Sequence, residues 1–226
     1  MVYKHSEPRK SKLGNQFKTI RSILILTCTS LIFFSTIKSA MAHHPMGGKT
    51  PANFWEGLLS GMGHPIIGID HLAFVVAVGL IAAKIPNGIL ILASFLATAM
   101  LGTGIHLLSI DLPLTEIAIA LSVVGFGAML VLKPTLKTSL LIMFAGVAGI
   151  FHGYAYGEAI IGVEMTPLLA YLIGFTAVQF FIALLAMKCA ELVSSYWENQ
   201  FFSLMRFLGL AISAIGVVFF TSAILG

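Results

Sequence analysis

Residues 166–187 read TPLLAYLIGFTAVQFFIALLAM, an apolar run of 22 residues without a single charged side chain. The hydrocarbon core of a bilayer is about 30 Å thick, and an α-helix needs about 20 apolar residues to cross it. The run therefore predicts a membrane-spanning helix. The whole chain shares this character, because 58% of its 226 residues are hydrophobic and only 10% are charged. A soluble domain carries about 25% charged residues, so the composition excludes a soluble enzyme and a disordered tail.

Five further segments beyond residue 42 have the length and apolarity of a membrane span. Turn residues separate them, as in Pro86-Asn87-Gly88, and no alternation typical of strands competes. The sequence therefore predicts an all-α, polytopic membrane helix bundle with six transmembrane helices. We expect these helices near residues 65–83, 88–108, 114–132, 138–156, 166–187 and 204–225. We also expect a short interfacial helix at 52–62 and an amphipathic helix at 190–202 on the inner surface.

The first 42 residues differ in kind from the rest of the chain. They hold seven basic groups and one acidic group, an apolar stretch from Ile23 to Ile37, and the triplet Ala40-Met41-Ala42. These features are typical of a secretory signal peptide with its cleavage site, and an uncleaved first helix is the alternative. We thus predict a signal peptide at 1–42, a periplasmic N-terminal segment at 43–64 that carries the interfacial helix, and a membrane domain at 65–226.

The distribution of basic residues beyond residue 42 predicts the orientation of the bundle in the membrane. Six basic groups stand against eight acidic groups beyond residue 42, and no basic stripe is left to bind a nucleic acid. If the mature N-terminus lies outside, five basic residues fall in inner loops and only Lys49 falls outside, in agreement with the positive-inside rule. The inner set is Lys84, Lys133, Lys137, Lys188 and Arg206. We therefore expect a bacterial inner (plasma) membrane protein with both mature termini on the periplasmic side.

Ionisable side chains at the start of the first span are candidates for function, because such groups are costly inside a membrane. The stretch is GHPIIGIDH, residues 63–71, and we expect Pro65 at the first helical position with His64 as its cap. Only 12 residues separate His71 from Lys84, too few to span, so Asp70 and His71 must lie within the membrane. At 3.6 residues per turn, His64 and His71 fall on one helix face.

The other candidate histidines and carboxylates fall at the outer ends of other predicted spans or in the mature N-terminal segment, so these candidates converge on the outer half of the bundle. Imidazole and carboxylate with little thiolate suit nickel, cobalt or zinc, and the sequence predicts a site for such a metal ion. Its candidate ligands are His64, Asp70, His71, His152, His106, Glu158, Glu116, His43 and His44. Packing hydrogen bonds for a lone histidine, an exposed tail for His43-His44 and helix-dipole compensation by Glu116 are the alternatives.

Two motifs resemble those of a known family. His64-Pro65-x-x-Gly68-x-Asp70-His71 and Phe151-His152-Gly153-Tyr154-Ala155 are similar to the two signatures of the HupE/UreJ family of nickel/cobalt permeases. This chain has Val75 and Tyr156 where many members have Met and His, and Glu158 stands one residue early. The resemblance implies a permease that imports Ni²⁺ or Co²⁺ as its substrate, without a prosthetic group, and downstream nickel or cobalt enzyme maturation proteins as partners.

A secondary transporter is the function that the sequence favours. No G-x-x-x-x-G-K-[ST] phosphate loop is present, so the ion gradient or the membrane potential would supply the energy. One alternative is a non-transporting accessory protein or metal sensor for metalloenzyme assembly. Another is an intramembrane zinc enzyme, although the H-E-x-x-H pattern that such an enzyme needs is missing. We therefore expect a protein that is not an enzyme.

Overall fold

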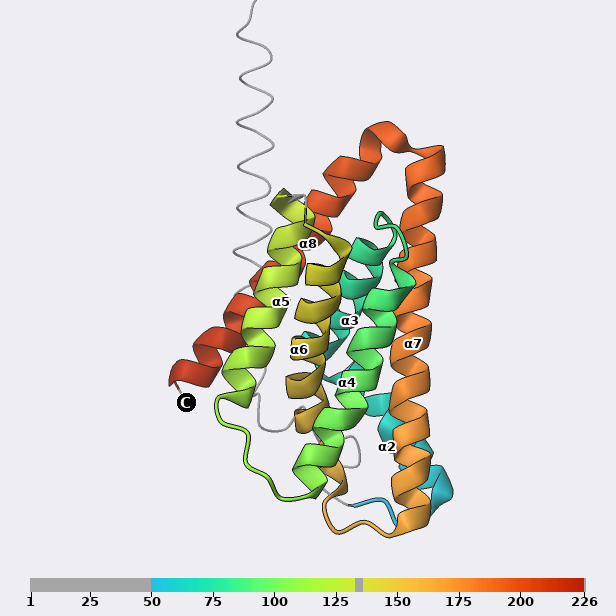
Figure 1. The fold of residues 1–226 in the computed structure, drawn as a ribbon, viewed down its shortest axis with the longest axis vertical. Coiled ribbons are helices and arrows are strands. Elements are labelled where there is room, and N and C mark those ends of the chain that lie inside the picture. The colour runs from blue at the N-terminus through green and yellow to red at the C-terminus, as the bar shows by residue number, and fades with distance from the viewer. Residues whose placement is uncertain (1–49, 133–135, 226) are drawn as a thin grey trace, which may run out of the picture. The chain divides into compact units, whose positions relative to one another are not determined.

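The computed structural model describes residues 50–132 and 136–225, and no β-strand occurs in these two stretches. The predicted signal peptide at 1–42 lies outside the described residues. His43 and His44 of the predicted N-terminal segment lie outside them as well. The prediction of an all-α bundle is confirmed (Figure 1). The elements are α2 (Phe54–Ile67), α3 (Ile69–Ala82), α4 (Ile89–Leu107), α5 (Thr115–Leu132), α6 (Thr138–Gly157), a 3₁₀ turn (Glu158–Ile160), α7 (Met165–Tyr196) and α8 (Glu198–Leu225).

Five of the described helices, α4 to α8, are each long and apolar enough to cross a membrane. Helices α2 and α3 are long and apolar enough to cross a membrane only when they are taken together, and this pair is bent by 78° at Gly68. Helix α3 alone has 14 residues and is about 21 Å long, short of the 30 Å core. The chain is therefore a multi-pass membrane protein with five spans, or six when the bent pair counts as one.

Helices α2 and α3 together run alongside α7 in the same direction. Successive glycines of α2 and α3 approach backbone carbonyls that lie progressively further along α7, and Lys84 beyond α3 contacts Ser194 near the end of α7. The α2–α3 pair and α7 are therefore parallel. The close approaches are Gly57 to Pro167, Gly61 to Tyr171 and Gly79 to Ala183. The pair is therefore one broken span, and not a loop that returns to the same side. Figure 1 shows α2 beside the lower half of α7, with α3 above it.

The predicted start of the first span at Pro65 is wrong, because α2 continues through His64 and Pro65 to Ile67. Side-chain hydrogen bonds set its beginning: the N-cap Asn53 side chain accepts from the Glu56 N–H, and the Glu56 carboxylate accepts from the Ala52 N–H at 2.8 Å. The short interfacial helix predicted at 52–62 is also wrong in its bounds, because α2 runs from Phe54 to Ile67 and packs along α7. The break falls at Gly68, whose extended backbone, with ψ 97°, ends the helix.

The separate amphipathic helix predicted at 190–202 does not form. Helix α7 continues without interruption to Tyr196, and α8 begins two residues later at Glu198. The reason is local, because neither glycine nor proline follows Gly174 until the helix ends, and Lys188 pairs with Glu191 one turn further on at 2.8 Å. The helices predicted near 88–108, 114–132 and 138–156 agree with α4, α5 and α6 to within one residue at each end.

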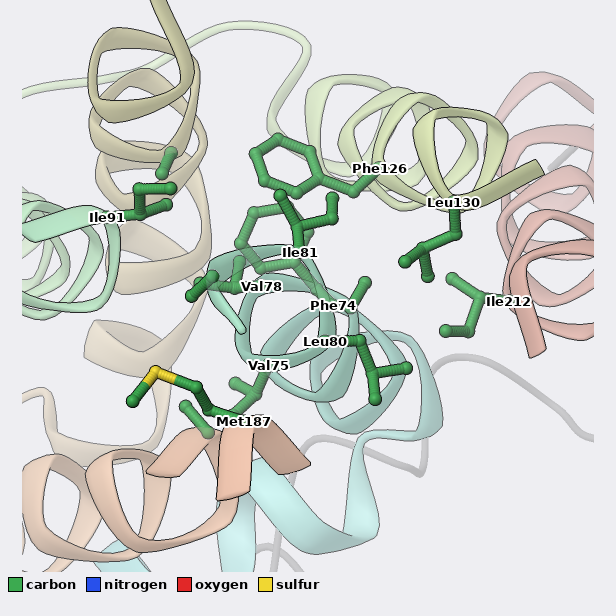
Figure 2. Packing of buried hydrophobic residues seen from close by; sticks show 14 of the residues in the cluster. Phe74, Val75, Val78, Leu80, Ile81, Ile91, Phe126, Leu130, Met187 and Ile212 are labelled. Carbon is green, nitrogen blue, oxygen red and sulfur yellow. The ribbon is translucent and has the colours of Figure 1, made fainter. Parts of the chain in front are cut away.

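Helix α3 occupies the centre of the bundle. Around it, α4 packs along α6, α5 along α8 and α2 along α7, while α3 itself contacts α4, α5, α7 and α8. Figure 2 shows Phe74 and Val78 of α3 packed near Phe126 of α5, with Met187 of α7 on another side. Nearly all of α3 is buried for this reason, and its first turn is held deep inside the protein.

Candidate metal site

Four of the predicted ligands come together where the broken span is interrupted. His64 lies in the last turn of α2, Asp70 and His71 lie in the first turn of α3, and His152 lies on α6. Each of the four is at most 1% exposed. The ring centroids of His64 and His71 are 5.9 Å apart, and those of His71 and His152 are 4.9 Å apart. The geometry thus gathers three imidazoles and one carboxylate from three helices.

Asp70 is an acidic side chain held inside the bundle. Its Oδ1 accepts the backbone N–H of His71 at 2.9 Å, within the first turn of α3. No described residue donates a hydrogen bond to its Oδ2. The positive end of the α3 dipole favours a negative charge here, but a buried acceptor without a donor is costly. The arrangement is one that a cation would stabilise.

His152 has both ring nitrogens engaged. Its Nδ1 lies 2.8 Å from Nδ1 of His71, and its Nε2 lies 2.9 Å from Oγ of Ser122 on α5. The ring also stacks on Phe74, with centroids 4.3 Å apart and planes 30° apart. Ser122 was not predicted, because a single hydroxyl in an apolar helix gives no signal in the sequence. The orientation of His152 is therefore fixed from three sides.

Tyr171 of α7 holds His64. Its hydroxyl lies 2.8 Å from Nδ1 of His64 and donates to the carbonyl oxygen of Tyr156 at 2.9 Å. The Tyr156 hydroxyl in turn donates to Oε1 of Gln179 at 3.2 Å, and all four side chains are buried. The sequence offered one hint of this network, since Gln179 and Tyr171 carry polar side-chain groups within the largely apolar run of residues 166–187.

The other predicted ligands do not join this cluster. His106 packs on Tyr154, with centroids 4.3 Å apart, and lines a separate cavity of about 330 Å³ that Asp111 also lines. No described residue hydrogen-bonds to Nδ1 of His106. Glu116 and Glu158 are exposed at the ends of their helices. His43 and His44 lie outside the described residues.

The cluster is a hydrogen-bonded network and not a ready-made coordination sphere. Within residues 50–132 and 136–225, no three His, Cys, Asp or Glu side chains are arranged to hold one metal ion together. Binding of an ion by the clustered side chains therefore requires at least one of them to move. The His71 ring has little room to move toward Gly68, because it packs so closely there that an added Cβ would lie 2.6 Å from its Cδ2.

Comparison with known proteins agrees with the two sequence motifs. A family model described as HupE / UreJ protein matches residues 31–219, which include every residue of the cluster. Protein HupE of Rhizobium leguminosarum bv. viciae is 30% identical over 139 residues, which cover 61% of this chain and 72% of that protein. No solved structure matches the chain. On the extent of the family match, the chain belongs to the HupE/UreJ family.

Proposed function

We propose that this protein is a secondary permease that imports Ni²⁺ or Co²⁺ across the bacterial inner membrane. The observation that carries the proposal is the buried cluster of His64, Asp70, His71 and His152 at the interruption of a membrane-spanning helix pair. Transporters commonly bind ions where a span is broken, because the ends of the half-helices supply charge and unpaired backbone groups there. Imidazole and carboxylate are ligands that divalent nickel and cobalt accept.

The depth of the cluster supports entry from the periplasmic side. Tyr171, which holds His64, is the seventh residue of α7 and lies about 9 Å along the helix axis from its start. The opposite end of the bundle carries Lys84, which meets Ser194, and Lys188. Basic residues favour the cytoplasmic side. The ion would thus reach the cluster by the shorter path from outside.

The membrane potential is sufficient to drive such transport. One elementary charge gains about 2.3 kcal/mol per 100 mV, so a divalent cation gains about 4.6 kcal/mol. That energy corresponds to accumulation of more than about 10³-fold, since each 1.4 kcal/mol is a factor of ten. Coupling to ATP is not needed for uptake on this scale.

Reconstitution tests the proposal. Purified protein in liposomes with a negative interior potential should take up radioactive nickel, whereas His71→Gln should take up none above empty liposomes. Glu191→Gln is the control, because Glu191 is a partly exposed carboxylate near the far end of α7. Flux into liposomes that contain only this protein separates a permease from a non-transporting accessory protein. Equal uptake by wild type and His71→Gln would contradict the proposal.

A further inference from the structure

Two hydrogen-bond chains in the cluster each begin at a main-chain carbonyl and pass through a hydroxyl to a histidine. A carbonyl oxygen only accepts, a hydroxyl has one proton to donate, and a neutral imidazole has one N–H and one lone pair. The position of each proton along such a chain therefore follows from the carbonyl at its start. Neither hydroxyl belongs to a residue predicted from the sequence.

The first chain runs from Tyr156 through Tyr171 to His64. The Tyr156 carbonyl lies one residue before the end of α6, where carbonyls lose their intrahelical donors, and the Tyr171 hydroxyl donates to it at 2.9 Å. The single hydroxyl proton is then used. The 2.8 Å contact between Tyr171 and His64 must be a bond donated by Nδ1–H of His64. The lone pair of His64 is consequently on Nε2.

The second chain runs from Ile119 through Ser122 and His152 to His71. Oγ of Ser122 donates to the Ile119 carbonyl at 2.7 Å, so Nε2–H of His152 donates to Ser122 at 2.9 Å. Nδ1 of neutral His152 then carries a lone pair and accepts Nδ1–H of His71 at 2.8 Å. The lone pair of His71 is likewise on Nε2, and His152 keeps no nitrogen for an ion.

We propose that Tyr171 and Ser122 are positioning residues that fix these tautomers, so that His64 and His71 offer Nε2 to the transported ion beside Asp70. In this arrangement His152 orients His71 and does not bind the ion. The inference rests on the proposed function, because it assigns roles within that metal site. Hydrogen bonds behind metal-binding histidines are worth about 10- to 100-fold in metal affinity, which sets the size of the expected effect.

The tautomers can be measured without any metal. Solid-state ¹⁵N NMR of histidine-labelled, metal-free protein in bilayers, at alkaline pH where the rings are neutral, reports which nitrogen of each ring carries the proton. Signals are assigned by their loss in His64→Gln, His71→Gln and His152→Gln. We expect Nδ1–H for His64 and His71 and Nε2–H for His152. The opposite tautomer at any of the three overturns the inference.

Removal of each hydroxyl tests the positioning role. Tyr171→Phe and Ser122→Ala should weaken Ni²⁺ binding and raise the KM for uptake about 10- to 100-fold, while the maximal rate stays near that of wild type. Tyr171→Phe should also give a mixture of His64 tautomers. The controls are Tyr154→Phe, which loses a hydroxyl that accepts from Leu112 N–H, and Ser94→Ala, which loses one that donates to the Ile142 carbonyl. Both controls should behave as wild type.

The outcomes separate this inference from the proposed function. If wild-type protein neither binds nor transports Ni²⁺, the proposed function is wrong, and the metal-free NMR spectrum still decides whether the two chains form. If the tautomers are as expected but both hydroxyl variants bind Ni²⁺ like wild type, the positioning role is overturned. If Tyr171→Phe does not accumulate, the inference is tested by the tautomers of the wild-type protein and by the Ni²⁺ affinity of Ser122→Ala.

Discussion

At the residue scale, Asp70 is the side chain whose burial needs explaining. It is 1% exposed, one carboxylate oxygen accepts from the His71 N–H, and no described residue donates to the other. A chain that only had to fold would be better served by a neutral side chain of the same shape, because desolvating a charge is costly. Its presence is explained if the carboxylate balances the charge of a bound divalent ion.

Asp70→Asn should separate stability from function. The amide keeps the size of the side chain and an oxygen for the His71 N–H while it removes the buried charge. We expect an unchanged or higher melting temperature, and metal affinity at least about 100-fold lower. Thermal unfolding in detergent and Ni²⁺ titration measure the two quantities. A less stable protein that still binds Ni²⁺ like wild type would show that Asp70 is structural.

Residues of the cluster were predictable only in part. His64, Asp70, His71 and His152 stand out in the sequence because ionisable groups are rare in apolar helices, and the structure brings them together. Tyr171 and Ser122 could not be found in the same way, since single hydroxyls are common in membrane helices. His106 was expected beside them, but sequence gives the depth of a residue along its helix more surely than the neighbour it faces.

At the element scale, the break between α2 and α3 is what creates the site. It brings the end of one half-helix, with His64, next to the start of another, with Asp70 and His71. The sequence predicted a proline at the start of a helix, whereas Pro65 lies in the last turn of α2. Both placements suit proline, and the long-range packing of α2 along α7 decides between them.

Gly68→Ala tests the importance of the break. The added Cβ would lie 2.6 Å from Cδ2 of His71, a ring that His152 already holds on its other side. We expect the His71 ring to be displaced and the affinity for Ni²⁺ to fall at least about tenfold, with normal protein levels. The control is Gly104→Ala, because a Cβ there meets no other part of the described chain within 4 Å outside its own stretch of helix. Wild-type affinity in Gly68→Ala would show that the break tolerates movement of His71.

At the scale of the whole molecule, the bundle surrounds a short central helix. Helix α3 contacts four neighbours that can each cross a membrane, and it carries the cluster at its first turn. The bundle and most of its helices were predictable, because apolar runs between turn residues are read directly from the sequence. The central place of α3 was not, since its apolar run is only slightly more hydrophobic than those of α4 and α5.

The predicted orientation is open to a labelling test. Glu164, just before α7, and Pro86, just after α3, are exposed and lie near opposite ends of the bundle. In a Cys189→Ser background, we expect a membrane-impermeant maleimide to label Glu164→Cys in intact spheroplasts, and Pro86→Cys only after permeabilisation. The cysteine at 189 is removed because it is exposed. The reverse pattern would place the cluster nearer the cytoplasm.

An experimental structure with nickel tests the central claim most directly. Anomalous scattering at the nickel edge locates the ion without assumptions about its ligands. We expect a peak between α2 and α3, about 2.1 Å from Nε2 of His64 and of His71 and beside Asp70. A peak only elsewhere, such as in the cavity lined by His106 and Asp111, would contradict the account.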